Sequence, residues 1–130
     1  MELRTYYEDT DAAGVVYHAN FLKFFERART EYFRCHGFGV ADLAAAGFIF
    51  PVVRMEIDFA APARHDEVLE VSTVPTRVGG SSVSLRQQVV RKADGRLLVD
   101  ALITLACVGP ELKPRRIPAE LRSFLAADVR

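Results

Sequence analysis

One long amphipathic segment constrains the fold of this chain more than any other feature. Apolar residues recur there at the i, i+3, i+4, i+7 spacing of one helical face, and charged residues lie elsewhere on the same helix. The apolar positions are Phe21, Phe24, Phe25, Ala28, Tyr32 and Cys35. Asn20 is expected to cap the start, because its side-chain oxygen can accept a bond from an otherwise unpaired amide. Gly37 is expected to follow the end of the helix.

The rest of the chain changes from helical spacing to the two-residue period of strands. Residues 53–59 alternate between apolar and charged side chains, which predicts a strand with one buried face. Pro75 predicts an edge position, a bulge or the end of pairing in its strand. The dipeptide Asp94-Gly95 is typical of a hairpin turn. We expect strands at residues 3–7, 53–59, 66–78, 82–91 and 97–108, and further helices at residues 39–47 and 118–127.

The length and element order favour one α+β domain. A chain of 130 residues is long enough for one hydrophobic core and too short for two. A strand, a long helix and then four strands indicate a single antiparallel sheet with its helices on one face. A curved sheet wrapped around the long helix would bury the aromatic stripe. We therefore predict a single domain over residues 1–130, with the last three strands in an antiparallel meander.

Residues 97–103 form a nearly continuous apolar run in which Asp100 is the only charge. A strand that is apolar on both faces needs cover on both. The long helix can cover one face, and a second copy of the chain is expected on the other. The run therefore predicts a homo-oligomer.

The charge balance argues against a nucleic-acid partner. Lysine plus arginine and aspartate plus glutamate number 17 each, so no net positive field attracts nucleic acid. Cys35 and Cys107 form no CxxC pair and lie within apolar patterns, so both are expected to be buried thiols. The sequence contains neither a signal peptide nor an apolar run long enough to cross a bilayer. We expect a cytoplasmic protein without a membrane span.

Residues that suit acyl transfer precede the long helix. Asp11 supplies a carboxylate, Gly14 allows a tight turn, and the first amides of the helix are unpaired donors that attract negative charge. A carboxylate opposite such donors is typical of acyl-transfer sites. Aspartates and Thr10 in a loop are also common turn and cap residues, and His18 alone is as consistent with a structural role. The residues alone leave both interpretations open.

The stretch from Tyr6 to Glu31 reads YYEDTDAAGVVYHANFLKFFERARTE. It resembles the signature YxxDTDxxGxVYHxNxLxFxExARxE of the hydroxybenzoyl-CoA thioesterase branch of hotdog-fold proteins, and is most similar to the Tol-Pal-associated (YbgC-like) acyl-CoA thioesterases. Weaker similarity continues through residues 50–71 and 113–118. The resemblance implies a hotdog fold, in which a curved antiparallel sheet of about five strands wraps around one long central helix. It also implies a homodimer or homotetramer with active sites at the subunit junction.

The resemblance also implies catalytic roles. The family's catalytic carboxylate matches Asp11, which would attack the thioester directly or act as a base toward water. A backbone amide at the position of His18 would polarise the carbonyl, and the His18 side chain would orient Asp11 or the attacking water. Asp9 fits a structural partner. Glu26 is the alternative base, because another hotdog branch uses a helix glutamate.

Two other chemistries have less support. Asp9, Asp11 and His18 carry ligand types that suit a divalent metal, but His36 and His65 lie in no ligand spacing with them. A cysteine nucleophile is disfavoured, because both thiols are expected to be buried. We expect no metal and no bound organic cofactor.

The substrate is expected to contact two further groups of residues. The expected substrate-binding residues are Asn20, Gly80, Ser81, Ser82, Lys113, Arg115 and Arg116. The glycine and the serines lie in a predicted turn, whose free amides can approach pantetheine or phosphate. The three cations form the only local excess of positive charge and suit nucleotide phosphates. A Gly-Gly turn and a solvated basic tail explain the same residues equally well.

The leading hypothesis is an acyl-CoA thioesterase that releases a free acid and CoA. A hydratase or dehydratase of the same fold is the first alternative, but such enzymes typically carry a histidine in a proline-rich HFPxxPxxPG-like setting that VVYHANFL lacks. A non-catalytic acyl-CoA-binding or scaffold protein is the second. Expected partners are the acyl-CoA substrate, further copies of the chain, and Tol-Pal envelope components or lipid-synthesis enzymes. Aromatic, short and long acyl groups all remain open.

Overall fold

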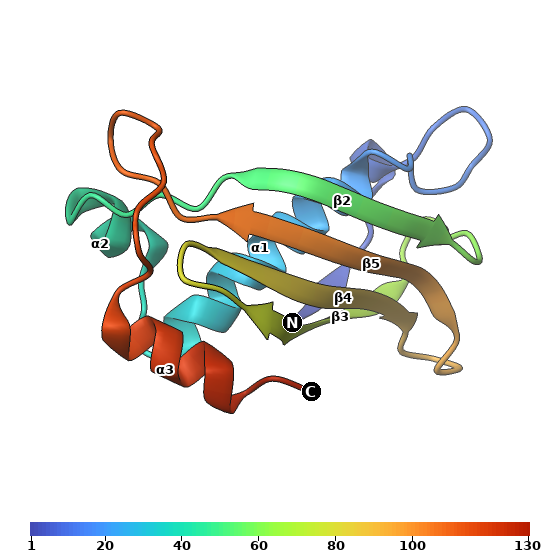
Figure 1. The fold of residues 1–130 in the computed structure, drawn as a ribbon. Helices are drawn as coiled ribbons and strands as arrows, with labels where there is room; N and C mark the ends of the chain where they lie inside the picture. Colours follow the sequence, from blue (N-terminus) through green and yellow to red (C-terminus); the bar gives the residue numbers. More distant parts are fainter.

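The computed structural model describes all residues 1–130. Figure 1 shows one sheet with the longest helix running across one of its faces and two shorter helices at one end. The elements are β1 (Glu2–Arg4), the 3-10 turn η1 (Tyr7–Asp9), α1 (Asn20–Cys35), α2 (Val40–Ala45), β2 (Val52–Phe59), β3 (Val68–Val78), β4 (Ser82–Arg91), β5 (Leu97–Ala106) and α3 (Ala119–Ala127). This architecture confirms the expected α+β class, with a five-stranded sheet around one long helix.

All five strands pair antiparallel, in the order β1-β3-β4-β5-β2. β3, β4 and β5 follow one another as the expected meander. Pro75 lies in the inner strand β3, where the pairing register shifts between Pro75 and Arg77. The irregularity accommodates a residue that has no amide to donate. The bulge is therefore confirmed. Pro75 also lies at a locally open edge, because β1 pairs with β3 only at Val68–Glu70.

The first strand is shorter than its sequence pattern predicts. β1 ends at Arg4, and the chain then turns into η1. The Tyr6 amide donates to Asp9 Oδ2 at 2.7 Å, which stabilises this turn in place of strand pairing. The chain is thereby redirected away from the sheet and toward the start of α1.

α1 buries its aromatic face against the inner face of the sheet. Phe24 and Phe25 of the helix, and Leu85 and Ile103 of the strands, are at most 2% exposed. Such burial contributes roughly 1.5 to 3 kcal/mol for each large apolar side chain. The contact between helix and sheet is the centre of the hydrophobic core.

The C-terminal half of α1 differs from the expected pattern. Phe33 is buried and Cys35 is exposed, so the prediction of a buried Cys35 thiol is wrong. The sheet covers the side of the helix that carries Arg29 and Phe33, four residues apart, and Cys35 lies off that side. Cys107 is buried as expected, and this burial raises the pKa of its thiol.

One polar side chain of β4 joins the sheet to the helix inside the core. Gln87 is completely buried, and its Nε2 donates to the Phe25 carbonyl oxygen at 3.0 Å and to Thr73 Oγ1 at 2.9 Å. Its Oε1 accepts a hydrogen bond from Arg29 Nη1 at 3.1 Å. Burial lowers the pKa of the Arg29 guanidinium, because the charged form loses water. Gln87 thus supplies the acceptor that this buried group requires.

β2 is an edge strand and is more exposed than its alternating sequence predicts. Val53 is 60% exposed and Phe59 is 50% exposed, although the pattern places both on a buried face. Met55 and Ile57 do pack against the core. Because the sheet ends at β2, no neighbouring strand covers its outer edge in a single chain.

We expect Gln87→Leu to lower the free energy of unfolding by about 2 to 3 kcal/mol, because the Arg29 guanidinium loses its acceptor within the core. Gln88→Leu is the matched control. Gln88 is half-buried on the opposite face of β4 and donates to Asp100 at 3.2 Å, so its replacement should change stability by less than about 0.5 kcal/mol. Urea denaturation measures both values. Equal losses would contradict a special role for Gln87.

Candidate functional site

Residues 10–17 form a tight loop before α1. Thr10 and Val16 pair in an antiparallel bridge, and the Asp11 amide donates to the Val15 oxygen at 3.0 Å. The Gly14 amide donates to the Asp11 oxygen, also at 3.0 Å. Gly14 has a φ of +78°, which glycine adopts without strain. These bonds close the loop and place Asp11 at one end of it.

The Asp11 carboxylate is exposed on this loop. Its Oδ1 accepts a hydrogen bond from the Ala13 amide at 2.9 Å, the usual turn-stabilising bond of an aspartate. No group of the chain bonds its Oδ2. One carboxylate oxygen therefore holds the turn, and the other is free to meet a substrate or a water molecule.

α1 begins without a side-chain cap, so the prediction of Asn20 as the N-cap is wrong. The cap position is Ala19, whose backbone is already helical at φ −67° and ψ −20°. The Asn20 amide bonds back to the Tyr17 oxygen at 2.8 Å, and this turn replaces the extended conformation that a capping side chain requires. The Asn20 side chain instead donates to the Asp9 oxygen at 2.8 Å.

The backbone amides of His18 and Ala19 are free donors at the start of α1. The amides on either side, those of Tyr17 and Asn20, bond to carbonyl oxygens within the chain, whereas those of His18 and Ala19 have no acceptor. Unpaired amides at the N-terminal end of a helix carry partial positive charge and attract anions. This geometry agrees with the donor that the resemblance implies at His18.

The His18 side chain is exposed beside two aromatic rings. Its ring centroid lies 4.6 Å from that of Tyr17 and 6.0 Å from that of Phe59, at the end of β2. No hydrogen bond joins the His18 ring to Asp11 in the single chain. The ring therefore lies in an open aromatic surface.

Asp9 stabilises the base of the loop. Its backbone oxygen accepts hydrogen bonds from the Tyr17 amide at 2.9 Å and from the Asn20 side chain. Glu26 lies on the exposed side of α1, where its carboxylate accepts a hydrogen bond from Thr30 Oγ1 at 3.3 Å. No group of three or more His, Cys, Asp or Glu side chains is arranged to hold a metal ion.

The basic residues singled out for CoA binding lie at the other end of the sheet. Figure 1 shows this end at the left and the loop before α1 at the right. Arg116 lies against Gly80, where a Cβ in place of the glycine hydrogen would be 3.5 Å from Arg116 Nη1. Arg115 donates to the Gly47 oxygen at 2.8 Å and stacks over the Phe48 ring, 3.9 Å from its centre. Arg116 is thus available beside the turn, and Arg115 is engaged in packing.

The turn between β3 and β4 uses most of its backbone groups within the chain. The Ser81 oxygen accepts from the Cys107 amide at 2.7 Å, and the Gly79 amide donates to the Ser82 oxygen at 2.8 Å. Lys113 is highly exposed, with Glu111 3.7 Å away as its one ionic neighbour. The structure therefore brings Gly80, Ser81 and Arg116 together but places them far from Asp11 and Asn20.

Residues 61–64 support the loop, although no sequence pattern indicates this role. The Val16 amide donates to the Ala63 oxygen at 2.7 Å, and Val15 and Arg64 form a bridge. In the sequence these residues read only as a break between strands, because no local pattern reveals a contact with residues nearly 50 positions earlier. None of the five principal cavities contains Asp11 or His18, so the site of a single chain is an open surface.

Comparison with known proteins gives the same family by sequence and by structure. The thioesterase superfamily profile matches residues 13–98. The acyl-CoA thioester hydrolase YbgC of Escherichia coli O6:H1 is 44% identical over 120 residues, which cover 92% of this chain and 89% of that protein. The acyl-CoA thioesterase YbgC of Haemophilus influenzae is 40% identical over 123 residues, with 93% and 89% coverage.

A crystal structure of a probable thioesterase from Bartonella henselae superposes with a TM-score of 0.85. It is 39% identical, and the match covers 91% of this chain and 97% of that one. Sequence and fold therefore agree over nearly the whole chain. This protein belongs to the thioesterase superfamily of hotdog-fold proteins, with YbgC acyl-CoA thioesterases among its relatives.

Proposed function

We propose that this protein hydrolyses the thioester bond of an acyl-CoA to give a free acid and CoA. The observation that carries the proposal is that one loop joins an unbonded Asp11 Oδ2 to the free amides of His18 and Ala19 at the start of α1. The names of the YbgC relatives support this reaction class. A donor site and a carboxylate are the two groups that thioester hydrolysis requires.

The proposed reaction uses both groups. The free amides stabilise the carbonyl oxygen as it gains negative charge. Asp11 either takes a proton from a water molecule that attacks the carbonyl carbon, or attacks that carbon itself to form a mixed anhydride that water then hydrolyses. In both routes the C–S bond breaks, and the departing CoA thiolate is protonated. The carboxylate ends the cycle ionised, as it began.

A homodimer is part of the proposal, because a single chain leaves the site open. β2 is the longer of the two edge strands and exposes Val53 and Phe59. Antiparallel pairing with β2 of a second copy would cover these side chains and give the free edge its hydrogen-bond partners. A two-fold axis through β2 would also place the basic end of the second copy beside Asp11.

This pairing would let residues from opposite ends of the sheet serve one substrate. Lys113 and Arg116 of one copy would meet the nucleotide phosphates, and the turn at Gly80, Ser81 and Ser82 would meet pantetheine. The other copy would supply Asp11, His18 and Asn20 at the thioester. Two such dimers would form the homotetramer that is the alternative assembly.

The cellular location of the protein and its partners other than the substrate are proposals. No helix of the structure is both long and apolar enough to cross a bilayer. We propose a cytoplasmic enzyme that needs neither a metal nor a bound organic cofactor. Association with Tol-Pal components or with lipid-synthesis enzymes is proposed on the resemblance alone.

Val53→Lys should convert the oligomer to monomers and lower acyl-CoA hydrolysis by more than about tenfold, because a charged group would replace an apolar side chain that the pairing covers. Val129→Lys is the matched control: Val129 is also exposed but lies at the C-terminus, away from β2. Sedimentation velocity at micromolar concentration and thiol release measure the two effects. A fully active monomeric wild type would refute the dimeric site.

Asp11→Asn should lower kcat by about 100- to 10,000-fold with little change in the circular dichroism spectrum, because the amide can neither take a proton nor attack. Thiol release is measured across aromatic, short and long acyl-CoA substrates, which also identifies the acyl class. Glu26→Gln should keep nearly full activity. The reverse result would make Glu26 the base and remove Asp11 from the mechanism.

His18→Ala should cost less than Asp11→Asn, with kcat falling by less than about a hundredfold. The reason is that the proposed oxyanion donor is the backbone amide, which alanine keeps. Single-turnover thiol release with the same substrate compares the two variants. Losses of equal size would assign the imidazole a main catalytic role.

A further inference from the structure

A short segment between β2 and β3 lies directly behind the proposed catalytic loop. Ala63 is completely buried, and its carbonyl oxygen accepts from the Val16 amide at 2.7 Å. Val15 bridges to Arg64 on the same segment. Val15 in turn accepts the hydrogen bond of the Asp11 amide. Two successive backbone contacts therefore connect residues 62–64 to the Asp11 backbone.

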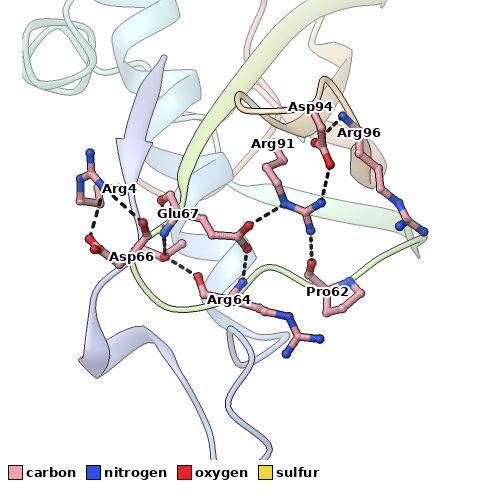
Figure 2. A network of polar contacts seen from close by, with 9 residues as sticks. Arg4, Pro62, Arg64, Asp66, Glu67, Arg91, Asp94 and Arg96 are labelled. Atoms are coloured by element: carbon pink, nitrogen blue, oxygen red, sulfur yellow. Dashed lines mark hydrogen bonds and ion pairs between the residues drawn. The ribbon is translucent and has the colours of Figure 1, made fainter.

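The other side of this segment is held by side chains and not by a strand. Figure 2 shows Arg91, Glu67 and their neighbours converging on it. Arg91 Nη2 donates to the Pro62 oxygen at 3.0 Å, and the Arg64 amide donates to Glu67 Oε1. Thr5 Oγ1 donates to the Arg64 oxygen at 2.6 Å. Residues 62–64 belong to no strand, so these side chains set their position.

Arg91 and Glu67 also hold each other. Arg91 Nε lies 2.6 Å from Glu67 Oε2, and Arg91 Nη1 donates to Asp94 Oδ2 at 2.9 Å. The side chains of Arg91 and Glu67 are only 17% and 22% exposed, in contrast to the neighbouring Lys92–Glu2 pair at 53% each. The planar guanidinium donates hydrogen bonds to Asp94 and to the Pro62 oxygen, and its contact with Glu67 is an ion pair in which Nε makes no well-aligned hydrogen bond.

We propose that Arg91 and Glu67 are positioning residues for Asp11. They fix residues 62–64, and these residues hold Val15 and Val16. Val15 and Val16 in turn hold the loop that carries Asp11. This inference rests on the proposed role of Asp11. It assigns the pair a place in catalysis although neither side chain touches the site. The effect passes through the backbone, so a small displacement of residues 62–64 moves the carboxylate relative to the free amides of α1.

The size of the expected effect separates positioning from a general loss of stability. An error of about 1 Å in the placement of a catalytic group can reduce the rate by about a hundredfold. The proposed CoA contacts at Gly80, Lys113 and Arg116 lie at the other end of the sheet, so binding should change little. Loss of the pair should therefore act on kcat and leave KM nearly unchanged.

The first experiment compares Arg91→Met with Lys92→Met, which removes the adjacent and more exposed ion pair of the same hairpin. We expect kcat to fall by about 10- to 100-fold in Arg91→Met, with KM within about threefold of wild type. Lys92→Met should behave as wild type. Glu67→Gln provides a second variant of nearly unchanged shape and should lower kcat in the same direction. Wild-type kcat in both Arg91→Met and Glu67→Gln would overturn the inference.

A double variant tests whether the effect acts through Asp11. Adding Arg91→Met to Asp11→Asn should cause no further loss of kcat, because there is no carboxylate left to position. A purely structural role would instead make the two losses multiply, which would contradict the proposal. Retained activity in Asp11→Asn alone would refute the proposed role of Asp11, which is a different outcome from failure of the positioning role.

Hydrogen exchange supplies a readout that does not depend on activity. The Val16 and Asp11 amides should exchange faster in Arg91→Met than in wild type or Lys92→Met, because the Ala63 oxygen is no longer held in place. Amides in the centre of β4 and β5 should keep their protection. Unchanged exchange at Val16 would overturn the inference even if kcat falls.

Discussion

Burial of the aromatic face of α1 under the curved sheet is the constraint on which the rest of the structure depends. Phe21, Phe24 and Phe25 are almost completely buried, so the rotation of the helix about its axis is determined. The hydrogen bond from Gln87 to the Phe25 oxygen also sets its position along the sheet. The start of α1, with its free amides, therefore emerges at a defined place beside the end of β2.

The proposed site is an exposed loop whose backbone is anchored by hydrogen bonds to other parts of the chain. The helix holds one end of it, and residues 62–64 hold its back. Arg91 and Thr5 donate hydrogen bonds to residues 62–64, and Glu67 accepts one from the Arg64 amide. This arrangement reconciles two needs of a hydrolase: access for the substrate and precise placement of a carboxylate. The Arg91–Glu67 pair is more enclosed than the Lys92–Glu2 pair beside it, and its proposed role is to fix the geometry of residues 62–64.

The proposed dimer follows from where the candidate groups lie on the sheet. The loop that carries Asp11 and the basic turn lie at opposite ends of the sheet, and the exposed edge of β2 runs between them. Two-fold pairing along that edge is the simplest operation that brings unlike ends together. Exposed apolar residues on an edge strand, which would otherwise favour aggregation, then have a function.

Much of this protein can be predicted from local patterns. The period of the apolar residues identified α1 and the strands of the meander, and the long motif before and within α1 identified the family. Local rules were wrong where a tertiary contact competes with them. Asn20 has the right chemistry for a cap, yet its side chain bonds Asp9, and the tight turn at Tyr17 makes Ala19 the cap instead.

The sequence by itself determined most of the elements, the fold class and the family, because periodicity and motif spacing act over a few residues. Only the tertiary structure decided which edge stays open, which side of α1 faces the sheet, and that Arg91 and Glu67 lie behind the loop that carries Asp11. These contacts join residues far apart in the chain. They depend on strand order and register, which no local pattern encodes.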